Sequence, residues 1–251
     1  MVTKTLRLSV LTLLAGASLL SPLAAQEGDG APFGYQGEIG PAHWGELDEA
    51  YEACAVGLRQ SPIDIPGDAP LSTVDLAFNY QPSAINVVNN GLTIQVNYDP
   101  GSTIIVDGKA YAVAQFHFHV PSEHTIDGVY APIEMHVVHV ADDGALAVVG
   151  FLFDFADEDN PFLARFWGDA PAAGETATVP GEINVADAFD AAGGKYSYTG
   201  SLTTPPCSEG VSWFVMADHL AVSRDQVAEY VDLLGMNARP TQPLNERAIG
   251  G

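Results

Sequence analysis

The chain has 251 residues, 47% of them hydrophobic, which is enough for a sizeable core in one large domain or two small ones. Against 32 Asp and Glu residues stand only 9 Lys and Arg residues, a formal net charge of -23. A chain this acidic repels a phosphate backbone, so no nucleic acid is expected among its partners.

The first 25 residues have the pattern of a secretory signal peptide. Lys4 and Arg7 precede an apolar run over residues 8–20, and small residues follow up to Ala25. This run has about 13 residues, whereas a membrane-spanning helix needs about 20 residues. We therefore expect a signal peptide over residues 1–25, a mature domain over residues 26–251, a periplasmic or secreted location, and no stable membrane anchor after cleavage.

Cleavage would make the chain more acidic still. Because the signal segment holds two bases and no acid, the mature chain keeps 9 - 2 = 7 bases against 32 acids, a formal charge of 7 - 32 = -25. Lys109 and Lys195 are its only lysines. We take this as a sign of adaptation to salt, since salt screens the repulsion among like charges. In an oxidising compartment Cys54 and Cys207 could form one disulfide, or stay as two buried thiols.

Strand patterns dominate the mature chain. Residues 26–70 are rich in Gly and Pro and read as an irregular wrap, with a short helix near residues 45–51. Helices are also expected over residues 160–167 and, after the N-cap Ser223, over residues 224–234 up to Gly235. Between these helices, residues 170–181 read as a loop, and no composition shift there indicates a domain boundary. Runs of β-branched and aromatic residues, separated by turn signals, predict strands over residues 84–88, 92–98, 103–106, 111–120, 133–141 and 145–153. The predicted fold is mainly β: one domain on a large, twisted, mostly antiparallel sheet with a few short peripheral helices.

Histidines cluster in the predicted strands. His117 and His119 are two residues apart, so on a strand their side chains share one face. A third imidazole from a neighbouring strand, His136 or His139, would complete a three-nitrogen site for Zn²⁺ with an open fourth position. These two have opposite parity, so only one of them can reach the metal. Glu134 shares the face of His136 and could fix its tautomer, which favours His136.

A hydroxyl group is predicted beside this metal. The segment at Thr203 and Thr204 is followed by two prolines, and by itself it could be only a stiff turn. A hydroxyl can accept a hydrogen bond from zinc hydroxide if its own proton is held by an acceptor. Glu123 is the candidate acceptor.

Taken together, several motifs resemble the α-class carbonic anhydrases, bacterial secreted type. The resemblance covers essentially the whole mature region. The matching segments are residues 43–45 (HWG), 60–65 (QSPIDI), 89–91 (NNG), 115–119 (QFHFH), 122–125 (SEHT), 134–139 (EMHVVH), 202–206 (LTTPP), 239–240 (RP) and 242–244 (QPL).

The resemblance implies a role for each matching residue. It makes Thr203 and Glu123 the pair that orients zinc hydroxide, and His139 a structural residue. The Zn²⁺ ligands would be His117, His119 and His136, with Gln115 and Glu134 as hydrogen-bond partners of His117 and His136. The apolar wall for carbon dioxide would be Val138, Val148, Leu202 and Trp213. The polar wall that holds ordered water would be Tyr35, Asn90, Gln95 and Thr204. The resemblance also implies a Cys54–Cys207 disulfide and cis peptide bonds at Pro62 and Pro206.

The implied activity is zinc-dependent, reversible hydration of carbon dioxide to bicarbonate and a proton by zinc-bound hydroxide. Sulfonamides and anions would inhibit it, and the resemblance also admits a homodimer. The alternatives are a catalytically silent binding domain of the same family and ester hydrolysis by zinc as a side activity. Every implied ligand is present, as are Thr203 and Glu123, which favours the enzyme.

The chain departs from the family pattern at two positions. Leu92 stands where members with fast turnover carry the histidine that shuttles protons from the metal to buffer. Leucine binds no proton, so we expect proton export to limit turnover. His43 is a conceivable substitute, although it matches a structural histidine of the family. Phe33 replaces the usual Trp, which affects packing only.

Overall fold

The computed structural model describes residues 30–250, so the expected signal peptide lies outside the described residues. Its strands are β1 (Asp64–Ile65), β2 (Leu76–Asn79), β3 (Ser83–Asn89), β4 (Ile94–Asn97), β5 (Thr103–Val106), β6 (Lys109–His119), β7 (Thr125–Ile126), β8 (Val129–Tyr130), β9 (Ile133–Val140), β10 (Leu146–Ala156), β11 (Glu175–Ile183), β12 (Lys195–Ser201), β13 (Glu209–Met216) and β14 (Leu220–Ser223). The α-helices are α1 (Trp44–Leu47), α2 (Ala53–Val56) and α3 (Arg224–Leu234). The 3₁₀ turns are η1 (Gly37–Ile39), η2 (Glu49–Tyr51), η3 (Leu163–Arg165), η4 (Trp167–Asp169) and η5 (Val185–Asp187).

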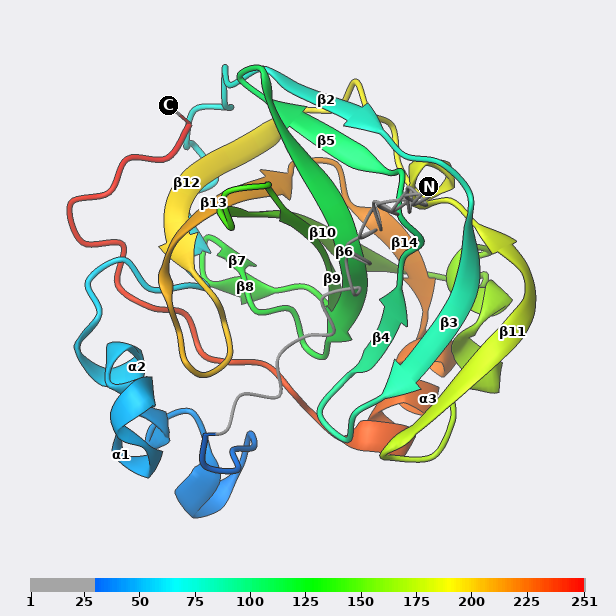
Figure 1. The fold of residues 1–251 in the computed structure, drawn as a ribbon, viewed down its shortest axis with the longest axis horizontal. Helices are drawn as coiled ribbons and strands as arrows, with labels where there is room; N and C mark the ends of the chain where they lie inside the picture. Colours follow the sequence, from blue (N-terminus) through cyan, green and yellow to red (C-terminus); the bar gives the residue numbers. More distant parts are fainter. Residues whose placement is uncertain (1–29, 251) are drawn as a thin grey trace, which may run out of the picture.

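One large curved sheet organises the molecule (Figure 1). Its main path runs β11-β3-β4-β6-β9-β10-β13-β12; β5 joins β6, β2 joins β5, and β14 joins β10. Most neighbours are antiparallel, but β10 runs parallel to both β13 and β14. A small second sheet has the order β1-β7-β8. The predicted fold class, a mainly β protein built on one large sheet with short peripheral helices, is therefore confirmed.

The sheet is buried on both faces at its centre, which explains the sequence of its strands. Strand β10 is a near-continuous apolar run whose residues from Ala147 to Phe153 are all buried. Such runs are typical of strands covered on both sides. The larger apolar cluster includes Phe116, Phe118 and Val137, and the smaller one includes Val148 and Trp213. The metal-binding candidates lie in β6 and β9, at the middle of this sheet.

Several predicted elements differ from those found. Part of the expected loop at residues 170–181 is strand β11, which pairs antiparallel with β3. Most of its side chains are exposed because it is an edge strand, so it lacks the apolar alternation that marks a half-buried strand. The expected helix at residues 160–167 is instead the 3₁₀ turns η3 and η4, and the one near residues 45–51 is split between α1 and η2.

Helix α3 matches its prediction. It spans Arg224–Leu234 and begins with a capping box, in which Ser223 Oγ accepts a hydrogen bond from the Gln226 amide at 3.0 Å. Gly235 follows in the left-handed region, with φ of +79°.

The N-terminal segment is joined to the sheet by a covalent link. Cys54, in α2, forms the implied disulfide with Cys207, which follows β12. The Ser61–Pro62 and Pro205–Pro206 peptide bonds are cis, as implied, and Val120–Pro121 is cis as well. Among the described residues, no helix is long and apolar enough to cross a membrane.

Candidate metal centre

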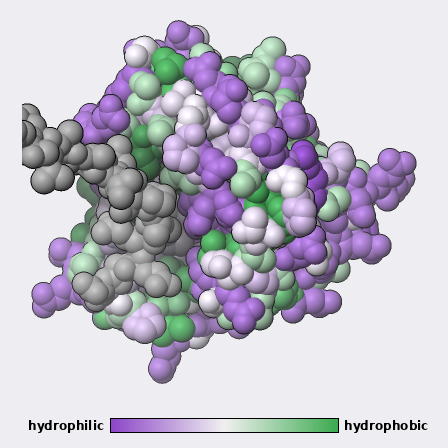
Figure 2. Space-filling model, turned by 45° about the vertical axis from the view of Figure 1, so that its right-hand side comes forward, coloured by the Kyte–Doolittle hydropathy of each residue, from purple (hydrophilic) through white to green (hydrophobic). Residues whose placement is uncertain are grey.

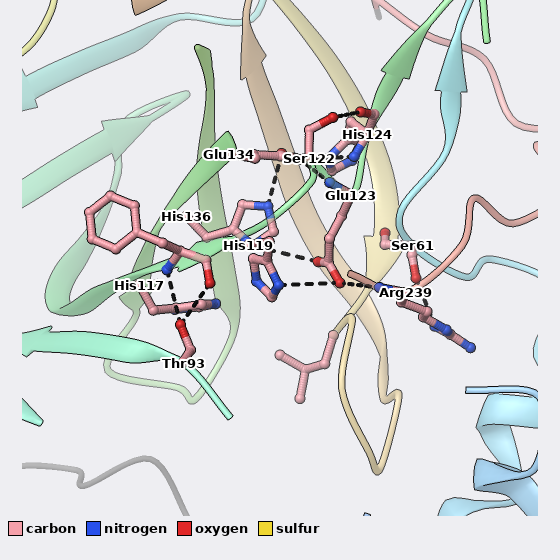
Figure 3. A network of polar contacts seen from close by, with 12 residues as sticks. Ser61, Thr93, His117, His119, Ser122, Glu123, His124, Glu134, His136 and Arg239 are labelled. Atoms are coloured by element: carbon pink, nitrogen blue, oxygen red, sulfur yellow. Dashed lines mark hydrogen bonds and ion pairs between the residues drawn. The ribbon is translucent and has the colours of Figure 1, made fainter. Parts of the chain in front are cut away.

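Adjacent antiparallel strands bring three imidazoles together. In the β6–β9 register, His117 lies opposite His136, and His119 is two residues further along β6 on the same face. One ring nitrogen from each of the three lies within 4.8 Å of the others. Figure 3 shows the rings converging. Parity allowed only one of His136 and His139 to join them, and the choice of His136, made from the nearby Glu134, agrees with this placement. His139 instead contacts Tyr80 in the core at 3.0 Å.

Two of these rings are held through Nδ1, which leaves Nε2 free. His117 Nδ1 lies 2.8 Å from Oε1 of Gln115, on the same face of β6. His119 Nδ1 donates to the backbone carbonyl of Asn237 at 2.9 Å. His119 Nε2 is buried and has no hydrogen-bond partner. A buried nitrogen without a hydrogen-bond partner that faces two other imidazoles is suited to bind a metal ion.

The third ring is held through the opposite nitrogen. His136 Nε2 donates to Oε1 of Glu134 at 2.9 Å, which leaves Nδ1 free. His124 Nδ1 donates to the same oxygen at 2.7 Å, while His124 Nε2 lies 2.7 Å from the hydroxyl of Tyr198. Gly150, opposite His136 in β10, makes room for this arrangement, since a Cβ there would lie 2.9 Å from Glu134 Oε1. His124, Glu134 and His136 also lie close enough together to hold a metal, but their atoms that face one another are already joined by hydrogen bonds. The cluster of His117, His119 and His136 instead offers three nitrogens without such partners.

Glu134 is held as an anion. Burial alone would raise its pKa, but hydrogen bonds and attraction from His124 and His136 hold the pKa of Glu134 well below its usual value. Its other oxygen, Oε2, accepts the backbone amides of Glu123 and His124, each at 2.8 Å. A carboxylate with this many donors keeps its charge even when it is buried.

The donor set fits zinc. Burial lowers the pKa of His119 to about 4, holds the pKa of His117 well below its usual value, and also lowers the pKa of His136. The three imidazoles are therefore neutral at physiological pH, the form in which histidine binds a metal. Three histidine nitrogens with one open position are typical of a catalytic zinc site.

Glu123 lies beside these rings, 3.4 Å from Nδ1 of His119 and 3.9 Å from Nδ1 of His136, and Thr203 lies near Glu123. The Glu123 side chain is fully buried, and its Oε1 accepts the backbone amide of Arg239 at 2.8 Å. Burial raises the pKa of Glu123 to about 7, although His136, the Arg239 amide and the nearby Thr203 hydroxyl each lower it. Thr203 is itself buried. Residues 123 and 203 are far apart in the sequence, so only their chemistry and the family resemblance suggested that they act as a pair.

The implied apolar wall forms one cluster. Val148 of β10 lies opposite Val138 of β9 and beside Trp213 of β13. Val148 and Trp213 are buried in the smaller apolar cluster, and the partly buried Val138 and Leu202 pack against it. The Trp213 ring also lies 4.8 Å from that of His136, so this cluster adjoins the histidines.

The implied polar wall is more dispersed. Gln95 of β4 lies opposite His117 and donates to Asn97 at 2.7 Å. Tyr35 packs on Trp44, with ring centroids 5.7 Å apart. The other two residues lie in turns: Asn90 Oδ1 accepts the amides of Leu92 and Thr93, and the Thr204 carbonyl accepts that of Cys207.

The polar contacts of Leu92 and His43, the two positions weighed for proton transfer, are made with other groups than the three histidines. The partly exposed Leu92 is held through its carbonyl, which accepts from Asn237 Nδ2 at 2.9 Å. His43, the residue before α1, is exposed, and its Nδ1 lies 3.4 Å from Oε2 of Glu46 in that helix.

The roles of two residues at this site, Asn237 and His124, were not predicted from the sequence. Asn237 orients His119 through a backbone carbonyl, so its residue type carries no signal of that contact. His124 anchors Glu134; its place in the matching segment 122–125, directly after Glu123, was a signal for it, but no role was assigned from that. Both contacts depend on segments that are brought together by the fold.

The fold and the site together define the class: a protein built on one large β-sheet whose central strands carry a candidate three-histidine metal centre. A family model described as eukaryotic-type carbonic anhydrase matches residues 39–250. The chain belongs to this carbonic anhydrase family, and it is an enzyme of that kind.

Named relatives agree over nearly the full length. A carbonic anhydrase of a Nostoc species is 41% identical over 98% of this chain and 94% of its own. A carbonic anhydrase from Neisseria gonorrhoeae is 37% identical over 97% of this chain and 96% of its own length. The α-carbonic anhydrase of Thermovibrio ammonificans, solved in complex with the inhibitor sulfanilamide, is 41% identical, with a TM-score of 0.84 over 88% of this chain and 99% of that one.

Proposed function

We propose that this chain catalyses the zinc-dependent, reversible hydration of carbon dioxide to bicarbonate and a proton. The observation that carries the proposal is the set of three free imidazole nitrogens within 4.8 Å, on His117, His119 and His136. Zinc, when bound, supplies a hydroxide nucleophile at neutral pH, which is the established chemistry of carbonic anhydrases. The three neutral histidines leave the ion its full positive charge for that purpose.

Thr203 and Glu123 orient the nucleophile. The Thr203 hydroxyl donates a hydrogen bond to the buried Glu123 carboxylate, so the Thr203 oxygen can only accept a hydrogen bond from the nucleophile. That bond directs a lone pair of the nucleophile toward the substrate carbon. The Arg239 amide holds the other carboxylate oxygen at 2.8 Å and so fixes the orientation of Glu123.

The substrate lies against apolar side chains. Carbon dioxide has no net charge or dipole, and the Val138, Val148, Leu202 and Trp213 cluster adjoins the histidines. This surface holds the molecule weakly and in one place, a positioning effect. Because the Thermovibrio ammonificans relative was solved with sulfanilamide, we also expect sulfonamides to inhibit this chain.

A stopped-flow carbon dioxide hydration assay on zinc-loaded chain lacking residues 1–25 tests the proposal. We expect hydration that a sulfonamide abolishes, and loss of both zinc and hydration in His119→Ala. A chain with one zinc bound and no hydration would contradict the proposal and favour the silent binding domain. Ester hydrolysis, measured on the same samples, would then be the activity to compare.

We also propose that residues 1–25 direct export and are removed. The apolar run after Lys4 and Arg7 supports this, as does the Cys54–Cys207 disulfide, since disulfides persist in oxidising compartments. Expression of the full chain in a bacterial host should give a periplasmic or secreted protein whose N-terminal sequence begins near Gln26. Sedimentation of that product distinguishes a monomer from a homodimer.

A further inference from the structure

A buried polar junction links helix α3 to the peptide group of a metal-binding histidine. The carbonyl of Phe118, which belongs to the peptide bond before His119, receives three donors. They are the hydroxyl of Thr93 at 2.7 Å, the hydroxyl of Tyr230 at 2.8 Å and Nδ2 of Asn237 at 2.9 Å. The Thr93 hydroxyl oxygen also accepts a hydrogen bond from the amide of Phe118 at 3.2 Å, so Thr93 contacts both the N–H and the C=O group of Phe118 (Figure 3).

The same junction holds the group that orients the His119 ring. Asn237, whose carbonyl accepts from His119 Nδ1, is fastened through its side chain: Oδ1 accepts the amide of Val120 at 2.8 Å, and Nδ2 donates to the Tyr230 hydroxyl at 3.0 Å. Because a backbone amide can only donate, the contact with Val120 fixes which way the Asn237 amide points. Tyr230 thus contacts the peptide group that precedes His119 and also the residue that orients the His119 ring.

His119 differs in this respect from the other two ligand candidates. His117 is oriented by a side chain on its own strand, and His136 by a side chain two residues before it on β9. The partner of His119 lies in the segment after α3, outside the sheet. Its position therefore depends on how that segment is attached, and Tyr230 provides an attachment from within α3.

Tyr230 is well suited to hold its hydroxyl in place. Its side chain is almost fully buried, with 1% exposed, and its ring stacks on Trp167 with centroids 5.2 Å apart. Thr93 and Asn237 are buried too. With no water to replace a lost partner, the junction has a strong preference for one arrangement.

We propose that Tyr230 is a positioning residue for His119, acting through Phe118 and Asn237 to keep Nε2 of His119 aimed at the metal. This inference rests on the proposed zinc site. Groups that orient metal ligands typically change metal affinity by about 10- to 100-fold when they are lost. Tyr230 touches neither metal nor substrate, so its removal should weaken zinc binding without removing a ligand.

The test is the zinc dissociation constant of Tyr230→Phe, which deletes the hydroxyl and keeps the ring. Tyr98→Phe is the matched control, because Tyr98 is also buried and its hydroxyl donates to a backbone carbonyl, that of Gln81 at 2.8 Å. We expect zinc binding about tenfold weaker in Tyr230→Phe, an altered visible spectrum of its cobalt-substituted form, and neither change in Tyr98→Phe.

A second pair keeps the test decisive if Tyr230→Phe does not fold. Thr93→Val removes a hydroxyl from the same junction at nearly constant shape and should weaken zinc binding, whereas Thr93→Ser should restore it. Unchanged zinc affinity and cobalt spectrum in Tyr230→Phe, or equal losses in Tyr98→Phe, would overturn the inference. If the unaltered chain bound no zinc, the proposed function itself would fail, a result distinct from loss of the Tyr230 effect alone.

Discussion

The backbone amide of Arg239 donates to Oε1 of Glu123 at 2.8 Å, and the other oxygen, Oε2, is left buried without a hydrogen-bond partner. One oxygen of this carboxylate is thus fixed by a group that can only donate. The second stays available to accept a hydrogen bond from the Thr203 hydroxyl. The relation between the two residues gives the carboxylate one orientation and one free acceptor.

Replacing Glu123 by Gln should therefore reverse the polarity of this contact. Either the Gln amide turns its NH₂ group toward Thr203, or it faces the Arg239 amide with a donor. We expect kcat/KM to fall on the order of 100-fold, the size of effect that a small misplacement of a reacting group produces. Zinc content should stay at one per chain. The double variant with Thr203→Ala should lose little more than either single variant, because coupled residues are not additive. Additive losses would contradict a shared role.

Leu92→His should raise turnover by supplying a proton acceptor. We expect kcat in dilute buffer to rise about tenfold, below the about 100-fold that general acid-base catalysis commonly contributes, with a smaller effect on kcat/KM. In the unaltered chain, kcat should climb with buffer concentration. Leu92→Gln, polar and without a proton-binding group near neutral pH, is the matched control. Equal turnover of all three across a buffer series would refute proton export as the limiting step.

His139 should make the fold sensitive to acid. Burial lowers the pKa of His139 to about 3, whereas an unfolded histidine has a pKa of about 6.5. Between these values the unfolded state binds one more proton than the folded state, so stability falls as pH falls through this window. Each pH unit costs about 1.4 kcal/mol, and the whole window costs on the order of 5 kcal/mol.

Urea unfolding at a series of pH values checks this contribution. His139→Asn, compared at the same zinc loading, should lose less stability than the unaltered chain between about pH 6.5 and pH 3. It should also be less stable at pH 7, because the contacts of His139 with Tyr80 and the Ala147 carbonyl are gone. Parallel stability curves for the two proteins would contradict the assignment.

The disulfide should contribute to stability through the long loop that it closes. Cys54 and Cys207 are 153 residues apart, and loss of a native disulfide typically costs about 2–5 kcal/mol. We expect Cys54→Ser with Cys207→Ser to lower the free energy of unfolding by that amount, measured in urea. Reduction of the unaltered chain should give a similar value. A loss below about 1 kcal/mol in both experiments would show that the noncovalent contacts suffice.

The acidic surface should make stability rise with salt. Figure 2 shows a face on which hydrophilic residues predominate. The whole chain has 32 acidic residues and only 9 basic ones. We expect the melting temperature to rise between low salt and about 1 M NaCl, where the Debye length falls to about 3 Å. At pH 4, with many carboxylates protonated, the rise should shrink. An unchanged melting temperature at pH 7 would refute the hypothesis of salt adaptation.

Local patterns were enough to predict much of the sheet and to bring the candidate metal ligands together. The two-residue repeat of a strand places His117 and His119 on one face and puts His136 and His139 on opposite faces, which depends only on backbone geometry. The choice of His136 needed the nearby Glu134 and the family resemblance as well. Helix α3 was predictable because its capping residue and terminal glycine act within one turn. Strand β11 was not, since an edge strand with exposed side chains has no apolar pattern to detect.

What only the tertiary structure decided is how distant segments hold the site. The sequence by itself indicated the candidate chemical groups: three imidazoles through residue type and spacing, and a hydroxyl and a carboxylate through the family resemblance. It carried no trace of the Asn237 carbonyl that orients His119 or of the Arg239 amide that holds Glu123, because every residue has these backbone groups. Their roles arise from position alone, which is set by long-range packing of the segment after α3 against the sheet.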